Sequence, residues 1–348
     1  MQMCSDERST TTKWINGIVA PTEVTGAVRL FCFPHAGGGA SVFRSWMPQL
    51  APGIEVYPIQ LPGREGRWLE PRFTRSSDLI EVLVEALGPL LHPPYAFFGH
   101  SMGAFVVFEL ARELRRRGRA QPEILIMSGA RAPHVEDPDP PMHQLPPDLL
   151  LEELRRLDGI PAQLLEEPDL VSLMLPVLRD DVTVCETHEY LDEPPLDCSI
   201  SVYGGEVDRK ISPKHLGAWE IHTTRNFRHR IFPGNHFFYL NSSHTAVREA
   251  LCEDLRPYIR QAEAGPVSKR VELEQKIAMV WADLLRLPRV GIDDNFFDLG
   301  ANSLLMIQAH GKLREASIGT LSVLDLFQYP TVRLLAGAIS DSSTAFGE

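Results

Sequence analysis

The sequence predicts an α/β protein: a parallel β-sheet with helices on its faces, followed by a small helical domain. Short apolar runs alternate with helix-length segments over the first 130 residues, as in β-α-β units. After an interruption, two more strand-like runs appear. Residues 268–348 then show helical patterns and no convincing strand. A length of 348 residues agrees with about two domains.

Each sheet element is marked by its own run of residues. Strands are predicted at residues 28–33, 54–59, 95–99, 123–129, 199–205 and 228–234, and helices at 78–91 and 102–117. The first four strands are short apolar runs, the last two are strand-like runs, and the helices show apolar residues at helical spacing. This order predicts parallel strands joined by helical crossovers.

The segment from 130 to 198 interrupts the alternation. It opens with a proline-rich stretch and continues as two helical runs, PDLLLEELRRL and PDLVSLMLPVLRDDV. We expect a helical lid over about 133–197, at the edge of the sheet where functional loops gather. The alternative is a packing excursion that only covers the sheet. Five apolar side chains of the lid would either line a channel for pantetheine and the acyl chain or only pack the lid onto the sheet: Met142, Leu173, Met174, Leu175 and Val177.

A domain boundary is expected near residue 262. Apolar periodicity stops in QAEAGPVSK, where small and polar residues surround a Gly-Pro pair. An amphipathic helix then begins at about 271. We therefore expect a first domain over 1–262, a linker over 263–269 and a helical domain over 270–340.

Composition excludes several classes of protein. Apolar residues make up 44% of the chain and the net charge is −12, so the chain is globular and would repel nucleic acid. Five scattered cysteines without a C-x-x-C pair argue against a structural metal site or a disulfide framework. No run approaches 18 apolar residues and the N-terminus is polar, so we expect a soluble cytoplasmic protein with no membrane partner.

A candidate nucleophile lies in GHSMG, residues 99–103. A predicted strand precedes this G-x-S-x-G motif and a predicted helix follows it, which is the setting of a nucleophile elbow. Such a turn exposes the Ser101 hydroxyl at a helix N-terminus, where developing negative charge is favoured. The alternative is a glycine-flanked turn in the core.

An acid and a base are expected later in the chain, in the order Ser, acid, His. Asp208 lies on the loop after the 199–205 strand, and His236 on the loop after the 228–234 strand. His236 would accept the serine proton and Asp208 would orient the imidazole. Other candidates are less well placed, as lid or surface charges (Asp180, Asp181, Asp192, Asp197) or as histidines away from such a loop (His215, His222, His229, His244).

Two loops would supply an oxyanion hole. One donor is the backbone N–H of Met102, directly after the serine, and a second is expected from the glycine-rich FPHAGGG loop after the first strand. A phosphate-binding glycine loop is the competing interpretation. It lacks both the G-K-[ST] ending and the G-x-G-x-x-G spacing.

A second serine of interest is Ser303, in DDNFFDLGANSL at the start of a helical run. Taken alone, it could be a simple N-cap serine.

The ordered set FPHAGGG, IQLPGR, GHSMGA, LPVLRDD, GGEVD and GNHFF resembles the type II thioesterases of nonribosomal peptide and polyketide synthesis. The resemblance covers roughly residues 14–260. It implies an α/β-hydrolase fold with a helical lid and hydrolysis of acyl or aminoacyl thioesters on carrier proteins. It also implies Ala36 as the second oxyanion donor. Related acyl-shuttling enzymes usually carry a cysteine nucleophile, so the serine favours transfer to water.

The stretch around Ser303 resembles the attachment motif of peptidyl and acyl carrier domains, with Ala301 in place of a glycine. This implies a four-helix carrier with 4′-phosphopantetheine on Ser303, attached by a phosphopantetheinyl transferase. The sequence contains no adenylation or acyltransferase domain, so the resemblance implies loading in trans by such an enzyme. Other carrier proteins and tailoring enzymes are further expected partners.

Three functions are compatible with these features. The first is a Ser-His-Asp thioesterase that acts on its own carrier or on others. The second is a carrier or scaffold protein that presents a tethered substrate to tailoring enzymes, with the hydrolase domain serving editing or docking. The third is an esterase or lipase with an incidental fusion, which the carrier motif disfavours.

Overall fold

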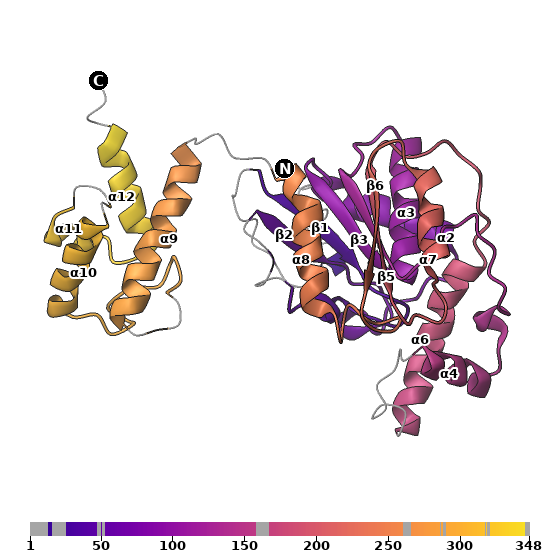
Figure 1. Ribbon diagram of the computed structural model, residues 1–348. Coiled ribbons are helices and arrows are strands. Elements are labelled where there is room, and N and C mark those ends of the chain that lie inside the picture. The colour runs from indigo at the N-terminus through magenta and orange to yellow at the C-terminus, as the bar shows by residue number, and fades with distance from the viewer. Residues whose placement is uncertain are drawn as a thin grey trace, which may run out of the picture. The chain divides into compact units, whose positions relative to one another are not determined.

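The computed structural model describes residues 13–15, 26–46, 50, 53–157, 167–259, 266–285, 287, 290–316, 318 and 321–344 (Figure 1). The chain forms two compact units, the first ending at Arg260 and the second beginning at Gln261. Each has its own hydrophobic core.

The first unit is built on a six-stranded sheet in the order β2-β1-β3-β4-β5-β6, with every neighbouring pair parallel. The predicted strands are present, with ends within two residues of those expected. Their bounds are β1 (Val28–Phe33), β2 (Ile54–Pro58), β3 (Tyr95–His100), β4 (Ile124–Ser128), β5 (Ser199–Gly205) and β6 (Phe227–Phe232).

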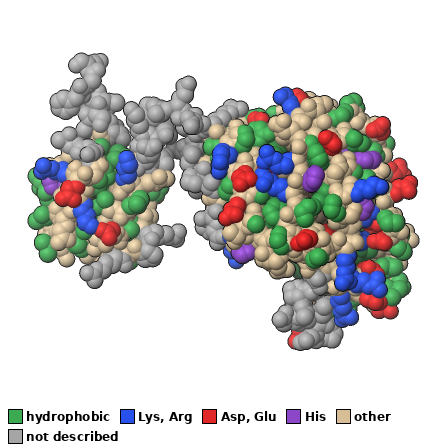
Figure 2. Space-filling view, viewed as in Figure 1, with side chains coloured by type: hydrophobic (Ala, Val, Ile, Leu, Met, Phe, Trp, Pro, Cys, Tyr) green, Lys and Arg blue, Asp and Glu red, His purple; other side chains and the backbone are tan. Residues whose placement is uncertain are grey.

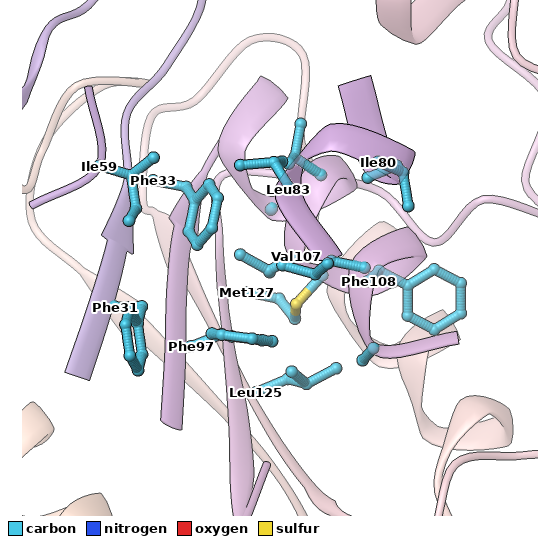
Figure 3. Close-up of a cluster of buried hydrophobic side chains, with 14 of the residues drawn as sticks. Phe31, Phe33, Ile59, Ile80, Leu83, Phe97, Val107, Phe108, Leu125 and Met127 are labelled. Atoms are coloured by element: carbon cyan, nitrogen blue, oxygen red, sulfur yellow. The ribbon is translucent and has the colours of Figure 1, made fainter. Parts of the chain in front are cut away.

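Helices cover both faces of the sheet (Figure 1). Strand side chains alternate between the faces, so Phe31 and Phe97 pack with Leu83 and Val107 of the helices on one side (Figure 3). That side is covered by α2 (Ser76–Leu87), α3 (Met102–Arg116) and the short α7 (Pro213–Gly217). The opposite side packs against α8 (His244–Leu255).

Helices α7 and α8 were not predicted. Helix α7 has only five residues. Helix α8 buries two charged side chains, Arg248 and Asp254, alongside its apolar ones. Asp254 accepts hydrogen bonds from Ser201 and Tyr203 of β5. Charged residues at buried positions weaken the apolar periodicity by which such a helix is recognised.

The insertion between β4 and β5 is helical, as predicted, and residues 133–197 are called the lid. Its described helices are η4 (Met142–Gln144), α4 (Pro147–Arg156) and α6 (Pro168–Glu186). A separate apolar cluster joins them, centred on Leu150 and Leu154 of α4 and Leu178 of α6. Helix α6 contains Pro176 in its interior.

The described part of the second unit holds four helices: α9 (Pro266–Leu285), α10 (Ser303–Glu315), α11 (Val323–Gln328) and α12 (Val332–Thr344). Trp281 stacks on Phe296 at a ring-centroid distance of 4.1 Å and forms the centre of this core. Helix α9 begins at Pro266, so residues 266–269 of the expected linker are helical. Residues 263–265 lie outside the described residues.

The visible surface of the first unit carries a mixture of charged and apolar side chains (Figure 2). On the face shown in Figure 2, acidic, basic and apolar side chains are interspersed over the first unit. In the part of the chain that the structure describes, no helix is both long and apolar enough to cross a bilayer. The same residues contain no group of three or more His, Cys, Asp or Glu side chains arranged to hold a metal ion.

Candidate active site

Four loops converge at one edge of the sheet. Ala36 follows β1, Ser101 follows β3, Asp208 follows β5 and His236 follows β6. Because all six strands are parallel, their carboxyl ends share this edge. The residues predicted separately from sequence therefore lie on loops of one rim.

Ser101 occupies a sharp turn between β3 and α3. Its φ is 53° and its ψ is −113°, a conformation that side-chain-bearing residues rarely adopt. Its N–H donates to the Ser128 carbonyl at 2.8 Å. The flanking glycines are required sterically, since a Cβ at Gly103 would lie 2.2 Å from the Phe33 carbonyl oxygen and one at Gly99 would lie 2.2 Å from the Gly103 oxygen. This is the geometry of a nucleophile elbow.

His236 and Asp208 are hydrogen-bonded to each other. The Nδ1 of His236 lies 2.7 Å from Oδ2 of Asp208, and both side chains are buried. The other carboxylate oxygen accepts the backbone N–H groups of Lys210 at 2.9 Å and Ile211 at 3.1 Å. The carboxylate is thereby fixed and keeps the imidazole oriented.

Two further histidines, His35 and His100, lie near His236. Burial, reinforced by the positive charge of a protonated His236, lowers the pKa of His35 to about 3 and the pKa of His100 well below its usual value. Nδ1 of His35 lies 2.7 Å from the hydroxyl oxygen of Tyr239. The ring of His100 stacks on Tyr239, and its Nδ1 lies 2.9 Å from the Ser128 hydroxyl oxygen. Neither ring titrates near neutral pH, and His236 is the imidazole of this group that Asp208 orients.

The predicted oxyanion donors lie on two of these loops. Met102 is the first residue of α3, and Ala36 lies in the loop between β1 and η1 (Ala40–Phe43). Within the described residues, the backbone N–H groups of Met102 and Ala36 have no protein acceptor. Both are therefore available to an oxygen of a bound substrate.

An ion pair in this region was not anticipated from the sequence. Asp181, expected as a lid or surface charge, is only 4% exposed and forms a two-bond pair with Arg64, at 2.6 and 2.7 Å. Asp180 beside it pairs with Arg72 at a more open position. The two partners come from IQLPGR and LPVLRDD, motifs that carried the family resemblance. Arg64 and Asp181 are 117 positions apart, so the spacing of nearby residues in the sequence does not predict their ion pair.

The lid's apolar side chains mostly pack the lid itself. Met142, Met174 and Leu175 belong to or contact the cluster of Leu150. Leu173 is 52% exposed. Val177 is buried, at 4% exposure, and a channel lined by these five side chains stays a prediction.

Ser303 is exposed at the first position of α10. The N-cap is Asn302, whose side-chain oxygen accepts the N–H groups of Leu304 and Leu305, each at 3.1 Å. The N-cap interpretation of Ser303 is therefore wrong, and its hydroxyl has no part in capping the helix. An exposed hydroxyl at a helix N-terminus suits a phosphodiester, because the helix dipole favours a negative charge there.

The sheet, the elbow and the His–Asp pair define an α/β-hydrolase. The thioesterase domain model matches residues 28–258, and the phosphopantetheine attachment site model matches residues 275–339. The chain belongs to the thioesterase family and carries a phosphopantetheine carrier domain after the hydrolase. The expected fold, enzyme class and cofactor are confirmed.

The chain is similar to several thioesterases and biosynthesis proteins of known pathways. Gramicidin S biosynthesis protein GrsT of Aneurinibacillus migulanus is 39% identical over 70% of this chain and 94% of its own. Thioesterase PikA5 of Streptomyces venezuelae is 36% identical over 71% of this chain and 86% of its own. The RedJ thioesterase of the prodiginine pathway in Streptomyces coelicolor is 37% identical, with a TM-score of 0.63 over 69% of this chain and 97% of its own. This chain is a thioesterase of the type II class of nonribosomal peptide and polyketide biosynthesis.

Proposed function

We propose that Ser101, His236 and Asp208 form the catalytic triad of this thioesterase, that Ala36 and Met102 donate to the oxyanion, and that Ser303 carries the phosphopantetheine. The hydrogen bond between His236 and Asp208, at the same sheet edge as the Ser101 elbow, is the observation that carries the proposal.

The reaction proceeds in two halves. Ser101 Oγ attacks the thioester carbonyl while His236 accepts its proton, and the negative oxygen is stabilised by the two backbone N–H groups. The C–S bond then breaks and His236 returns the proton to the departing sulfur, which leaves an acyl ester on Ser101. Water, deprotonated by His236, attacks this ester and releases the acid together with the free serine.

The residues around Ser303 fit phosphopantetheine: an exposed hydroxyl, a helix N-terminus and a cap supplied by the neighbouring Asn302. When bound, the group supplies the thiol on which an acyl unit is held as a thioester. A carrier domain requires a phosphopantetheinyl transferase and biosynthetic partner enzymes. We propose that an adenylation domain or an acyltransferase loads this carrier in trans.

The test follows the intact mass of the full chain with time. Ser303 is converted to an acyl-pantetheinyl form by a promiscuous transferase, in the wild type and in Ser101→Ala. We expect the acyl group to leave the wild type and to persist on the variant. Loss of the acyl group from both proteins would refute the catalytic role of Ser101. Loading of the Ser303→Ala variant would refute Ser303 as the attachment site.

Persistence of the acyl group on both proteins would favour the second function. The carrier would then present its substrate to tailoring enzymes, and the hydrolase would edit other carriers. A separate acylated carrier protein is then added as substrate. Its hydrolysis would show that the hydrolase acts on other carriers, whereas no hydrolysis would show that the hydrolase is inactive.

A further inference from the structure

Residues 35–39 of the loop between β1 and η1 read HAGGG and are called the glycine loop. Three consecutive glycines give this backbone unusual conformational freedom. An oxyanion donor stabilises a transition state only when it is already in place before the reaction begins. Something outside the loop must therefore hold Ala36 in position.

The lid supplies such a contact at Gly37. The N–H of Gly37 donates to Oδ2 of Asp181 on α6 at 2.7 Å. Gly37 has a φ of +77°, and a Cβ there would lie 2.4 Å from Cδ2 of Leu178, one turn earlier on α6. Helix α6 thus both packs against the residue after Ala36 and hydrogen-bonds to it.

Arg64 holds the carboxylate of Asp181 and a second point of the same loop. Its two terminal nitrogens bind the two oxygens of Asp181, and its Nη1 also donates to the carbonyl of Gly38 at 3.3 Å. Both side chains are only 6% exposed. A paired arginine and carboxylate shielded from water have little freedom to reorient.

We propose that Asp181 of the lid helix is a positioning residue for the oxyanion hole. Its two carboxylate oxygens are bound by Arg64 and by the Gly37 N–H. It fixes the Gly37 amide, and through it the backbone of Ala36, while Arg64 fixes Asp181. This inference rests on the proposed function, because it assigns the role of oxyanion donor to the Ala36 N–H.

One consequence concerns the lid itself. The part of α6 that follows Pro176 carries Asp181 and Leu178 and is bound to the glycine loop. The part that precedes Pro176 carries Leu173, which is exposed. Lid motion that keeps the oxyanion hole intact must therefore take place on the N-terminal side of Pro176.

The test compares Asp181→Asn with Asp180→Asn in the full chain. Asp180 is the adjacent residue on the same helix, and its carboxylate pairs with Arg72 instead of Arg64. With a soluble acyl-pantetheine thioester as substrate, we expect Asp181→Asn to lower kcat about 10- to 100-fold, less than the ~10²–10³-fold cost of losing an oxyanion donor outright. We expect KM to change less than about twofold, because ground-state binding does not use this contact. Asp180→Asn should behave as the wild type.

Two inhibitors separate positioning from general damage. An acyl-pantetheine trifluoromethyl ketone forms an oxyanion adduct with a nucleophilic serine, whereas the matching amide only occupies the ground-state site. Asp181→Asn should weaken the ketone by the factor seen in kcat/KM and leave amide binding unchanged. Equal weakening of both inhibitors would overturn the inference.

A double variant, Arg64→Met with Asp181→Leu, covers the case in which the single variant unfolds. Apolar replacement of a buried ion pair is often tolerated by the fold, but it removes the acceptor for Gly37. The inference is supported if the double variant melts near the wild-type temperature and its kcat is lower than that of the wild type. A wild-type kcat in the double variant overturns it. Ser101→Ala is the separate control: activity remaining there contradicts the proposed function, whereas an unaffected Asp181→Asn contradicts only this inference.

Discussion

His35 and His222 are two histidines of the first unit whose pKa is lowered by folding. Burial, reinforced by nearby positive side chains, lowers the pKa of His35 to about 3 and the pKa of His222 to about 4. His222 lies against Trp219 and Phe108, and its Nε2 is 2.8 Å from Nδ1 of His134. These rings are therefore neutral in the folded protein, whereas the unfolded chain protonates them near pH 6.5.

This difference makes stability depend on pH. A histidine whose pKa is lowered by folding binds fewer protons in the folded state, so its contribution to stability is present above pH 6.5 and lost as the pH falls toward the folded-state value. We expect the free energy of unfolding to decrease between pH 6.5 and pH 4, with each such histidine contributing at most about 1.4 kcal/mol per pH unit. Denaturant titrations of the full chain at several pH values measure this slope.

The variant His222→Gln should reduce that slope. His229→Gln, at an exposed position on β6, is the matched control and should leave it unchanged. An identical slope in the wild type and in His222→Gln would show that this ring does not carry the effect.

Among the elements, the lid has a small core of its own. Leu150 of α4 is fully buried against Leu178 of α6, whereas its neighbour Leu149 is 44% exposed. Removing a buried leucine side chain usually costs about 2–5 kcal/mol. The cluster joins the lid helices to one another. The substitution should therefore lower the stability of the lid more than that of the sheet.

We therefore expect Leu150→Ala to increase hydrogen exchange and protease cleavage within α4 and α6, while exchange in β3 and β4 stays close to that of the wild type. Leu149→Ala should resemble the wild type throughout. Equal loosening of the lid and the central strands in Leu150→Ala would mean that the lid and the sheet unfold as one unit.

The order of the strands and the candidate triad were predictable because each triad residue follows a strand-like run that local pattern identifies. Ser101, Asp208 and His236 needed only the positions of three strands. Asp181 could not be assigned in the same way, since its partner Arg64 belongs to a different loop and only the folded chain brings them together. The cap of α10 was likewise ambiguous, because Asn302 and Ser303 are both common at helix N-termini and one residue separates them.

At the scale of the whole chain, the two units have separate cores. One surrounds the parallel sheet, and the other is centred on Trp281 and Phe296. The boundary between the two units falls between Arg260 and Gln261. Domains with independent cores generally fold as units.

We therefore expect residues 261–348, expressed alone, to unfold cooperatively and to accept phosphopantetheine on Ser303. The first unit should keep the melting temperature that it has in the full chain. Scanning calorimetry of the full chain and of the two separated parts checks this. A carrier that is unfolded or unmodified on its own would show that it depends on the hydrolase.

The turn at Ser101 also limits what evolution can place there. Threonine offers the same hydroxyl, but its branched Cβ disfavours a backbone with φ of 53°. Cysteine has the unbranched Cβ of serine and meets no such obstacle. A homologue of this protein can therefore carry cysteine in place of Ser101 without strain at this turn. Threonine, the remaining small nucleophilic residue, is disfavoured by the positive φ of the backbone.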